Sequence, residues 1–249
     1  MFSLLVIPPS TFAESSKFLQ AKPGCQSKCG NVAIPYPFGI GDGCFIDPAS
    51  VGHKSAGYNM QCNTSFDPPK LFAGGTIEIL SISETELRVG TSITDKCYNA
   101  SGYRVPGTIW SFDARQTGFG ISYTKNRFFG IGCEIVATII GISGDNETVT
   151  STDSCVSKCR SRGNIEGACT GTNGCCQITV PKGLKNITLE VSGLLPGKPP
   201  IATYNSCNFA YVAEVGKHML QASDLLLDGD SIQNSLETGN SIVPVNIPR

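Results

Sequence analysis

Cysteine is the residue type in this 249-residue chain whose number and spacing could do the most chemistry. Cys25 and Cys29 have a spacing that zinc ligands use, and the same spacing recurs at Cys155 and Cys159. The chain holds only two histidines, and neither stands in a metal-ligand pattern. With twelve cysteines present, we predict disulfide bonds at these positions and no metal site, and the even count allows every cysteine to pair.

The cysteines fall into two groups of six along the chain. A load this high is typical of a protein that folds in an oxidising compartment outside the cytosol. Each group could close three bridges of its own, and the vicinal pair Cys175 and Cys176 is predicted to bond to two different partners. The sequence does not choose among the connectivities that six cysteines allow. The groups are Cys25, Cys29, Cys44, Cys62, Cys97 and Cys133, and then Cys155, Cys159, Cys169, Cys175, Cys176 and Cys207.

Four asparagines stand in the Asn-X-Ser/Thr pattern that accepts N-linked glycans. Their spread along a cysteine-rich chain agrees with passage through the secretory route and predicts a glycoprotein. The alternative for any one of them is an unmodified surface asparagine. They are Asn63, Asn99, Asn146 and Asn186.

Catalytic chemistry has no recognisable motif in the chain. A hydrolase needs a nucleophile beside a base, or two opposed carboxylates, and the acids here stand in no pattern of that kind. We therefore predict that the protein is not an enzyme and has no catalytic residue. The net charge of −1 favours neither nucleic acid nor an anionic membrane as a partner.

Two aromatic side chains stand on a stiffened backbone near the first cysteines. Pro35 and Pro37 fix the dihedral angle φ and so hold Tyr36 and Phe38 with little entropy left to lose. Such rings either stack on the apolar C–H faces of sugars or fill a small core. The residues alone leave these two interpretations about even.

Short strands joined by loops are the expected elements, because charged residues make up only 16% of the chain while glycine and proline are plentiful. Alternation of apolar and polar residues predicts a hairpin from 77–79 and 87–89. A long apolar run at 128–140 predicts one buried strand or two, with glycines permitting bends. Further strands are expected at 178–180, 187–191 and 209–213, and one short helix near 222–227. The predicted fold class is all-β with little helix, stabilised by disulfides.

Two small cystine-rich extracellular domains are the expected organisation. Residues 141–154 are rich in Gly, Ser, Thr and Asp, a composition typical of a linker. No stretch approaches the roughly 20 apolar residues that span a bilayer, so no membrane span is expected. The predicted parts are an atypical or truncated signal segment at 1–21, a first domain at 22–140, a linker at 141–154 and a second domain at 155–249.

A known family resembles these residues. The segment 25–41, with Ile34, Pro35, Tyr36, Pro37, Phe38 and Gly39 at its centre, resembles the opening of the galacturonan-binding domain of plant wall-associated receptor kinases. The segments 174–177, 180–184 and 206–210 are similar to the wall-associated kinase domain that follows it in those receptors. The likeness covers roughly residues 22–245, and we expect a wall-associated receptor kinase ectodomain without the transmembrane and kinase regions. A truncated receptor and an ectodomain-only protein both fit.

The resemblance implies a binding protein of the plant cell wall. Its ligand would be pectin, as homogalacturonan or oligogalacturonides, and calcium would enter through bridged pectate, with no other cofactor. The implied location is extracellular, in the wall, while full-length relatives sit in the plasma membrane. The alternative is an ectodomain that binds an extracellular protein partner.

Cationic side chains are the expected contacts for a polymer with one carboxylate per sugar. Residues 1–213 hold 17 Lys and Arg against 15 Asp and Glu, whereas residues 214–249 hold 2 against 5, so the first portion is the expected anion-binding surface. Taken singly, each cation is more simply a solvated charge. Further cations of this portion are Lys22, Arg115, Lys125 and Arg127, and a second cluster is Lys158, Arg160 and Arg162. The candidate ligand-binding residues are Lys28, Tyr36, Phe38, Lys54, Lys70, Arg88 and Arg104.

Overall fold

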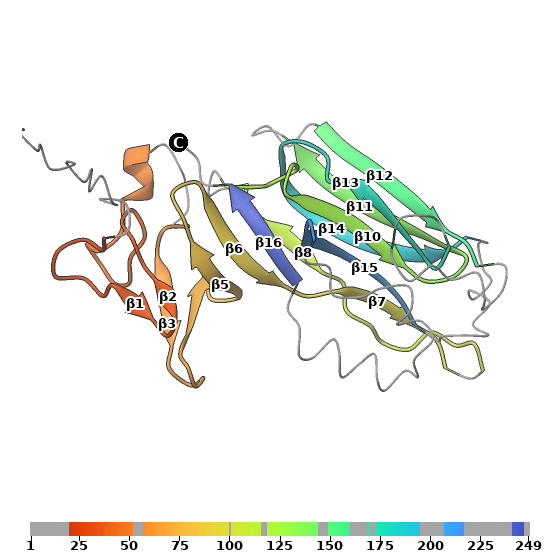
Figure 1. The fold of residues 1–249 in the computed structure, drawn as a ribbon, viewed down its shortest axis with the longest axis horizontal. Coiled ribbons are helices and arrows are strands. Elements are labelled where there is room, and N and C mark those ends of the chain that lie inside the picture. The colour runs from red at the N-terminus through yellow and green to blue at the C-terminus, as the bar shows by residue number, and fades with distance from the viewer. Residues whose placement is uncertain are drawn as a thin grey trace, which may run out of the picture.

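An elongated arrangement of β-sheets makes up the described part of the chain (Figure 1). The prediction of an all-β, disulfide-bonded protein is confirmed, with one short 3-10 helix, η1 (Pro48–Val51), among the described residues. The short helix expected near 222–227 and the segment 1–19 lie outside them. The structure is a computed structural model and describes residues 20–51, 57–99, 101–115, 119–143, 149–159, 169, 173–194, 207–216 and 241–246.

A six-stranded antiparallel sheet, with a small two-stranded hairpin beside it, forms one end of the molecule. Its predicted hairpin is present as β5 and β6. The hairpin beside it is β1 (Lys28–Cys29) and β2 (Val32–Ala33). In spatial order the sheet contains β3 (Met60–Asn63), β4 (Lys70–Ala73), β5 (Ile77–Ile82), β6 (Glu86–Thr91), β16 (Ser241–Asn246) and β9 (Gly120–Ile121).

Two four-stranded antiparallel sheets pack face to face at the other end as a β-sandwich. Every strand that the apolar runs predicted in this region is present. One sheet has the order β13 (Cys175–Thr179), β10 (Asn126–Ile131), β15 (Cys207–Glu214) and β7 (Thr94–Cys97). The other has the order β12 (Val149–Ser157), β11 (Ile135–Ser143), β14 (Leu184–Gly193) and β8 (Ser111–Asp113).

Strand β10 is buried on both faces, which explains the apolar run that begins at Phe128. Phe128 belongs to the main core cluster, whereas its neighbour Phe129 belongs to a second cluster. Phe129 stacks on Tyr211 of β15 with ring centroids 5.2 Å apart. Alternation along one strand therefore supplies two cores, because successive side chains point to opposite faces.

The vicinal cysteines follow the same alternation. Cys176 bonds to Cys155 of β12 in the facing sheet, and Cys175 bonds to Cys169. The prediction that the two sulfurs take different partners is confirmed. Gly130 lies opposite Cys176 in the ladder, and a Cβ on it would collide with the Cβ of Ala137 and come within 3.1 Å of the Cys176 sulfur. The close approach of the sheets at this disulfide therefore requires glycine.

All twelve cysteines are disulfide-bonded, as predicted, but the pairing does not follow the two groups. Two bridges, Cys97–Cys207 and Cys133–Cys159, join the first group to the second, so the expectation that each group pairs within itself is wrong. Strand pairing is the reason for the first of them, because Cys97 and Cys207 are direct register partners in β7 and β15. The remaining bridges within the first group are Cys25–Cys44 and Cys29–Cys62.

The segment expected to be a linker, 141–154, lies largely in strands. Its ends belong to β11 and β12, which pair from Ile135 with Ser157 to Ser143 with Val149. The segment has the polar composition of a linker because β12 is the edge strand of its sheet, where Thr152, Asp153 and Ser154 are exposed. Polar side chains are the usual cover of such an edge.

The C-terminal strand crosses the expected boundary between the two domains. All of β16 pairs with β6, and Val245 and Asn246 pair with β9 as well, so a strand from the expected second domain lies inside the sheet of the first. One core cluster runs through both ends of the molecule, from Ile34 to Val212. The chain is therefore better described as two interlocked parts, which we call the N-terminal module and the sandwich.

Substituting Gly130 by alanine is expected to lower the free energy of unfolding by about 1–3 kcal/mol, because the added methyl group overfills the space beside the Cys155–Cys176 bridge. Denaturant unfolding measures this change. The matched control is Gly120→Ala in β9, where the nearest atom to a new Cβ is 3.7 Å away, an ordinary contact. Equal stability of the two variants would contradict the close packing at Gly130.

Removing residues 241–249 is expected to destabilise the N-terminal module, since β6 and β9 lose the strand between them and their main-chain groups lose partners. The control removes only residues 247–249, which leaves β16 intact. Thermal unfolding followed by circular dichroism should show a lower midpoint for the longer deletion alone. Identical midpoints would show that β16 contributes nothing to the sheet.

Candidate functional site

Phe38 lies in the core, so its prediction as a sugar-binding ring is wrong. It is only 1% exposed, and its ring centroid lies 5.4 Å from that of Tyr58 and 6.3 Å from that of Phe119. A ring without accessible surface cannot stack on a ligand. Of the two interpretations of this aromatic pair, core filling holds for Phe38.

Tyr36 lies at the surface of the same segment. Its side chain is 42% exposed, while its main-chain N–H donates to the carbonyl of Gln20 at 2.9 Å. The N–H of Phe38 donates to the Pro35 carbonyl at 2.9 Å, which closes a tight turn around Tyr36. The turn thus holds an exposed ring in place, and Tyr36 remains a candidate contact.

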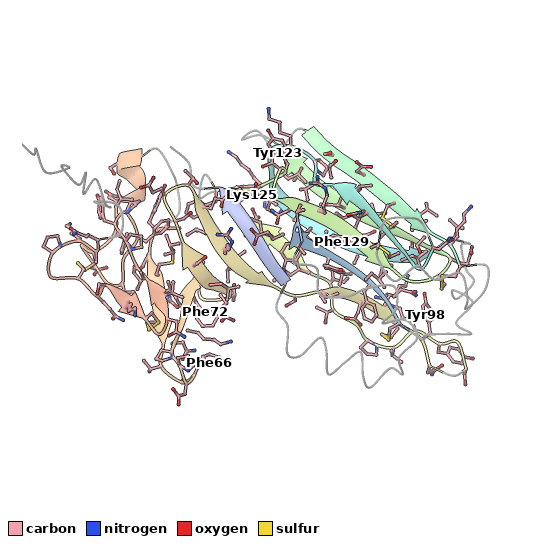
Figure 2. All side chains as sticks on the ribbon, in the orientation of Figure 1. Phe66, Phe72, Tyr98, Tyr123, Lys125 and Phe129 are labelled. Carbon is pink, nitrogen blue, oxygen red and sulfur yellow. A yellow bond between two sulfur atoms is a disulfide. The ribbon has the colours of Figure 1, made fainter. Side chains whose placement is uncertain are left out.

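The predicted cations do not gather in one cluster. Lys28 on β1 and Lys70 on β4 lie in the N-terminal module, and the Cys29–Cys62 bridge ties β1 to β3, the partner of β4. Arg104 is exposed and pairs through its main chain with Tyr98, which Figure 2 places at the opposite end of the molecule from Phe66. Lys54 lies outside the described residues. Among the described candidates, Lys28 and Lys70 are therefore the two cations whose strands the Cys29–Cys62 bridge brings together.

An aromatic and a cation meet on the loop between β3 and β4. Phe66 is 43% exposed, and its ring lies 6.1 Å from that of Phe72 and 4.9 Å from the Nζ of Lys70. Lys70 also pairs with Glu78 of the neighbouring β5 at 3.1 Å. We call Phe66, Lys70, Phe72 and Glu78 the Phe66 patch, and Figure 2 shows its two phenylalanines side by side at the edge of the module.

The loop that carries Phe66 is fixed from both sides. At its start, the Asn63 side chain accepts a hydrogen bond from the Ser65 N–H at 2.9 Å. At its end, the Pro69 carbonyl packs against Gly30, which has a φ of 54° and leaves no room for a Cβ. An exposed ring on a fixed loop loses little entropy when a ligand binds.

Phe66 was not among the residues that the sequence singled out. The available signal was its position, because a ring that follows Asn63, Thr64 and Ser65 and precedes Asp67 and two prolines stands in a turn, where burial is rare. The sequence offers no sign of the Lys70 approach. That contact depends on the register of β3 with β4, in which Asn63 pairs with Lys70.

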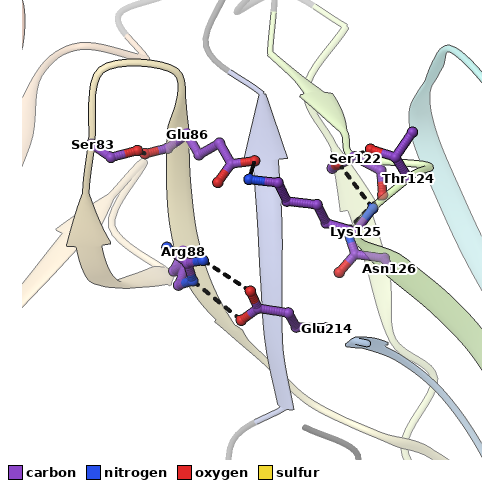
Figure 3. A network of polar contacts seen from close by, with 8 residues as sticks. All are labelled: Ser83, Glu86, Arg88, Ser122, Thr124, Lys125, Asn126 and Glu214. Carbon is purple, nitrogen blue, oxygen red and sulfur yellow. Dashed lines mark hydrogen bonds and ion pairs between the residues drawn. The ribbon is translucent and has the colours of Figure 1, made fainter. Parts of the chain in front are cut away.

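Arg88 lies at the junction of the module with the sandwich (Figure 3). It makes two hydrogen bonds to the carboxylate of Glu214, at 2.8 and 3.2 Å, and this pairing raises the pKa of Arg88 above its ordinary value. Two residues earlier on β6, Glu86 pairs with Lys125 at 2.6 Å. Both ion pairs connect β6 to the sandwich, so Arg88 and Lys125 hold the two parts together.

A further ion pair lies on the sandwich, between Asp113 and Arg115 at 2.6 Å. Its hydrogen bonds lower the pKa of Asp113 to about 2, and the Asn186 side chain contributes a smaller part. Asn186 is accordingly half-buried on β14, whereas the predicted glycan acceptors Asn63 and Asn99 are exposed. Asn146 lies outside the described residues, and glycosylation at all four stays a prediction.

Metal and membrane features were sought in the part of the chain that the structure describes. There, no three or more His, Cys, Asp or Glu side chains are grouped in a way that could hold a metal ion. Nor does any helix among those residues have the length and apolar character needed to cross a bilayer.

Comparison with known proteins finds a family that part of the N-terminal module resembles. Residues 25–92 match the family described as wall-associated receptor kinase, galacturonan-binding. This range contains β1 to β6 and the Phe66 patch. The resemblance of the segment 25–41 to a galacturonan-binding domain is thereby confirmed.

Proteins from Arabidopsis thaliana are similar to most of this chain. Wall-associated receptor kinase 2 is 32% identical over 200 residues, which are 79% of this chain and 24% of the relative. Wall-associated receptor kinase 4 is 31% identical over 212 residues, or 82% and 26%, and wall-associated receptor kinase 1 is 27% identical over 214, or 84% and 26%. The chain thus spans about a quarter of the length of these curated relatives. No solved structure matches it.

A double-mutant cycle with Arg88→Met and Glu214→Gln is expected to give a coupling free energy of about 1 kcal/mol, because the pair is bidentate but partly exposed to water. The coupling should fall at high salt. The same cycle on Asp113 and Arg115, which stand two residues apart on the chain and are more exposed, is the control and should give a smaller value. A coupling at Arg88 no larger than this control would contradict its role at the junction.

Proposed function

We propose that this chain, a wall-associated receptor kinase ectodomain-like protein, binds the galacturonan of pectin outside the cell without altering it chemically. The observation that carries the proposal is the match of residues 25–92 to the galacturonan-binding family. The six disulfides support an oxidising, extracellular setting. Recognition of the polymer requires exposed rings and cations in the N-terminal module, and the Phe66 patch offers both.

Galacturonate presents an apolar C–H face and a carboxylate, and the patch has a counterpart for each. The exposed Phe66 ring provides an apolar surface for the sugar face. Lys70 has three N–H donors, of which Glu78 engages one, and its side chain is 38% exposed. A neighbouring carboxylate on the polymer can therefore share Lys70 with Glu78, and exposed Lys28 adds a second cation to the module.

Salt and calcium dependence follow from this chemistry. Ion pairs at an exposed lysine are screened, so affinity for oligogalacturonides should fall as ionic strength rises. Calcium enters as the bridge between uronate chains, and the protein contacts the bridged ligand through the same patch.

Phe66→Ala and Lys70→Gln are each expected to weaken binding of an oligogalacturonide about tenfold at low salt, corresponding to about 1.4 kcal/mol. Isothermal titration calorimetry of the intact chain measures the change. Tyr103→Ala and Lys158→Gln are the matched controls, because both residues are exposed and lie outside residues 25–92. Their affinities should equal that of the unchanged chain.

Absence of binding by the unchanged chain at low salt, with and without calcium, would overturn the proposed function. Binding that Phe66→Ala and Lys70→Gln leave intact would instead move the site elsewhere on the module. Titration of Tyr36→Ala in the same series tests the other exposed ring of the module directly.

A further inference from the structure

The segment 180–184 is part of the family resemblance, yet it lies outside the residues that match the galacturonan-binding family. In the structure it forms the turn between β13 and β14. Val180 and Leu184 are buried on either side, while Lys182 between them is exposed. Gly183 has a φ of 80°, a conformation that suits glycine and turns the chain sharply after Lys182. The turn therefore anchors its apolar ends and presents one lysine to solvent.

An exposed aromatic ring lies beneath that lysine. Tyr123 is 38% exposed and stands in the turn that leads into β10, and the Nζ of Lys182 lies 5.7 Å from its ring centroid. The turn is braced at its base, where Asn126 donates a hydrogen bond to the carbonyl of Ser122 at 2.8 Å. Two buried strand ends thus hold a tyrosine and a lysine together at the surface.

The charge around this pair differs from that of the Phe66 patch. Lys70 shares its charge with Glu78, whereas no carboxylate pairs with Lys182 among the described residues. Lys125, two residues after Tyr123, is paired with Glu86, whose side chain is only 8% exposed, while that of Lys125 is 49% exposed. Figure 2 shows Tyr123 and Lys125 close together at the sandwich end that faces the module. The accessible charge at this place is therefore positive.

We propose that Tyr123 and Lys182 form a second contact site for an acidic sugar, on the sandwich and outside residues 25–92. The Tyr123 ring takes the apolar face of the sugar, its hydroxyl supplies a hydrogen-bonding group, and Lys182 pairs with the uronate carboxylate. The inference rests on the proposed function, because it assigns a further binding site for the same class of ligand. Two sites on one rigid chain give a long galacturonan a higher effective concentration at the second site once the first is occupied.

Nuclear magnetic resonance titration of the intact, isotope-labelled chain with trigalacturonate tests the second site by itself. Amide signals at 122–125 and 181–183 are expected to shift and saturate with a dissociation constant of their own. Lys182→Gln should weaken that constant about fivefold, and Lys182→Arg should restore most of it. Lys158→Gln, an exposed lysine with no aromatic partner among the described residues, should leave it unchanged. The methyl ester of the same trisaccharide, which lacks the charge, should bind this site about as weakly as Lys182→Gln binds the acid.

The outcomes separate the two proposals. Shifts at Phe66 and Lys70 without shifts at Tyr123 and Lys182 would overturn the second site and leave the proposed function standing. Shifts at Tyr123 and Lys182 alone would support the second site and overturn the Phe66 patch. Equal binding of the acid and its methyl ester at Tyr123 would also overturn the inference, because it requires the carboxylate.

Discussion

The pairing of β16 with β6 and β9 is the interaction on which the rest of the structure depends. Without it, β6 and β9 would expose unpaired main-chain groups, which are costly when buried and prone to pair with other chains when exposed. With β16 between them, the sandwich residues Glu214 and Lys125 reach Arg88 and Glu86 on β6. The same placement allows one core cluster to run through both parts of the molecule. The two parts are thus joined by main-chain, ionic and apolar contacts at once.

This interlocking bears on recognition. The family match ends at residue 92, directly after β6, so the matched residues contain neither β16 nor β9 of their own sheet. The Phe66 patch lies on the β3–β4 loop, β4 and β5 of that sheet, and its position relative to Tyr123 and Lys182 is set by the junction. A polymer that contacts both the Phe66 patch and the Tyr123–Lys182 pair would bind two contacts held at a fixed distance from each other. In the proposed account, the rigidity that disulfides give each part serves a binding surface that extends beyond the matched residues.

Local features of the fold could be predicted from the sequence, and features that join distant segments could not. The hairpin of β5 and β6 and the strands β10, β11, β13, β14 and β15 follow from alternation or apolar runs. The Cys97–Cys207 bridge, whose partners have a sequence separation of 110, and the insertion of β16 depend on long-range pairing that no local pattern encodes. The candidate binding residues show the same difference between local and long-range features. The charge of Lys70 makes it a candidate from the sequence alone. The contact between Lys70 and Phe66 depends on the register of β3 with β4, and the burial of Phe38 depends on its packing against Tyr58 and Phe119, which no local pattern encodes.

Hydrogen–deuterium exchange of the intact chain, with and without a long galacturonan, examines both contact places in a single experiment. Slower exchange is expected in the β3–β4 loop at 64–69 and in the turns at 122–125 and 181–183, because bound polymer restricts the backbone there. The loop at 101–108, which carries Tyr103 and Arg104, should exchange at the same rate in both conditions. Protection of that loop, or no protection in any of the three expected segments, would contradict a galacturonan surface that extends from the N-terminal module onto the sandwich.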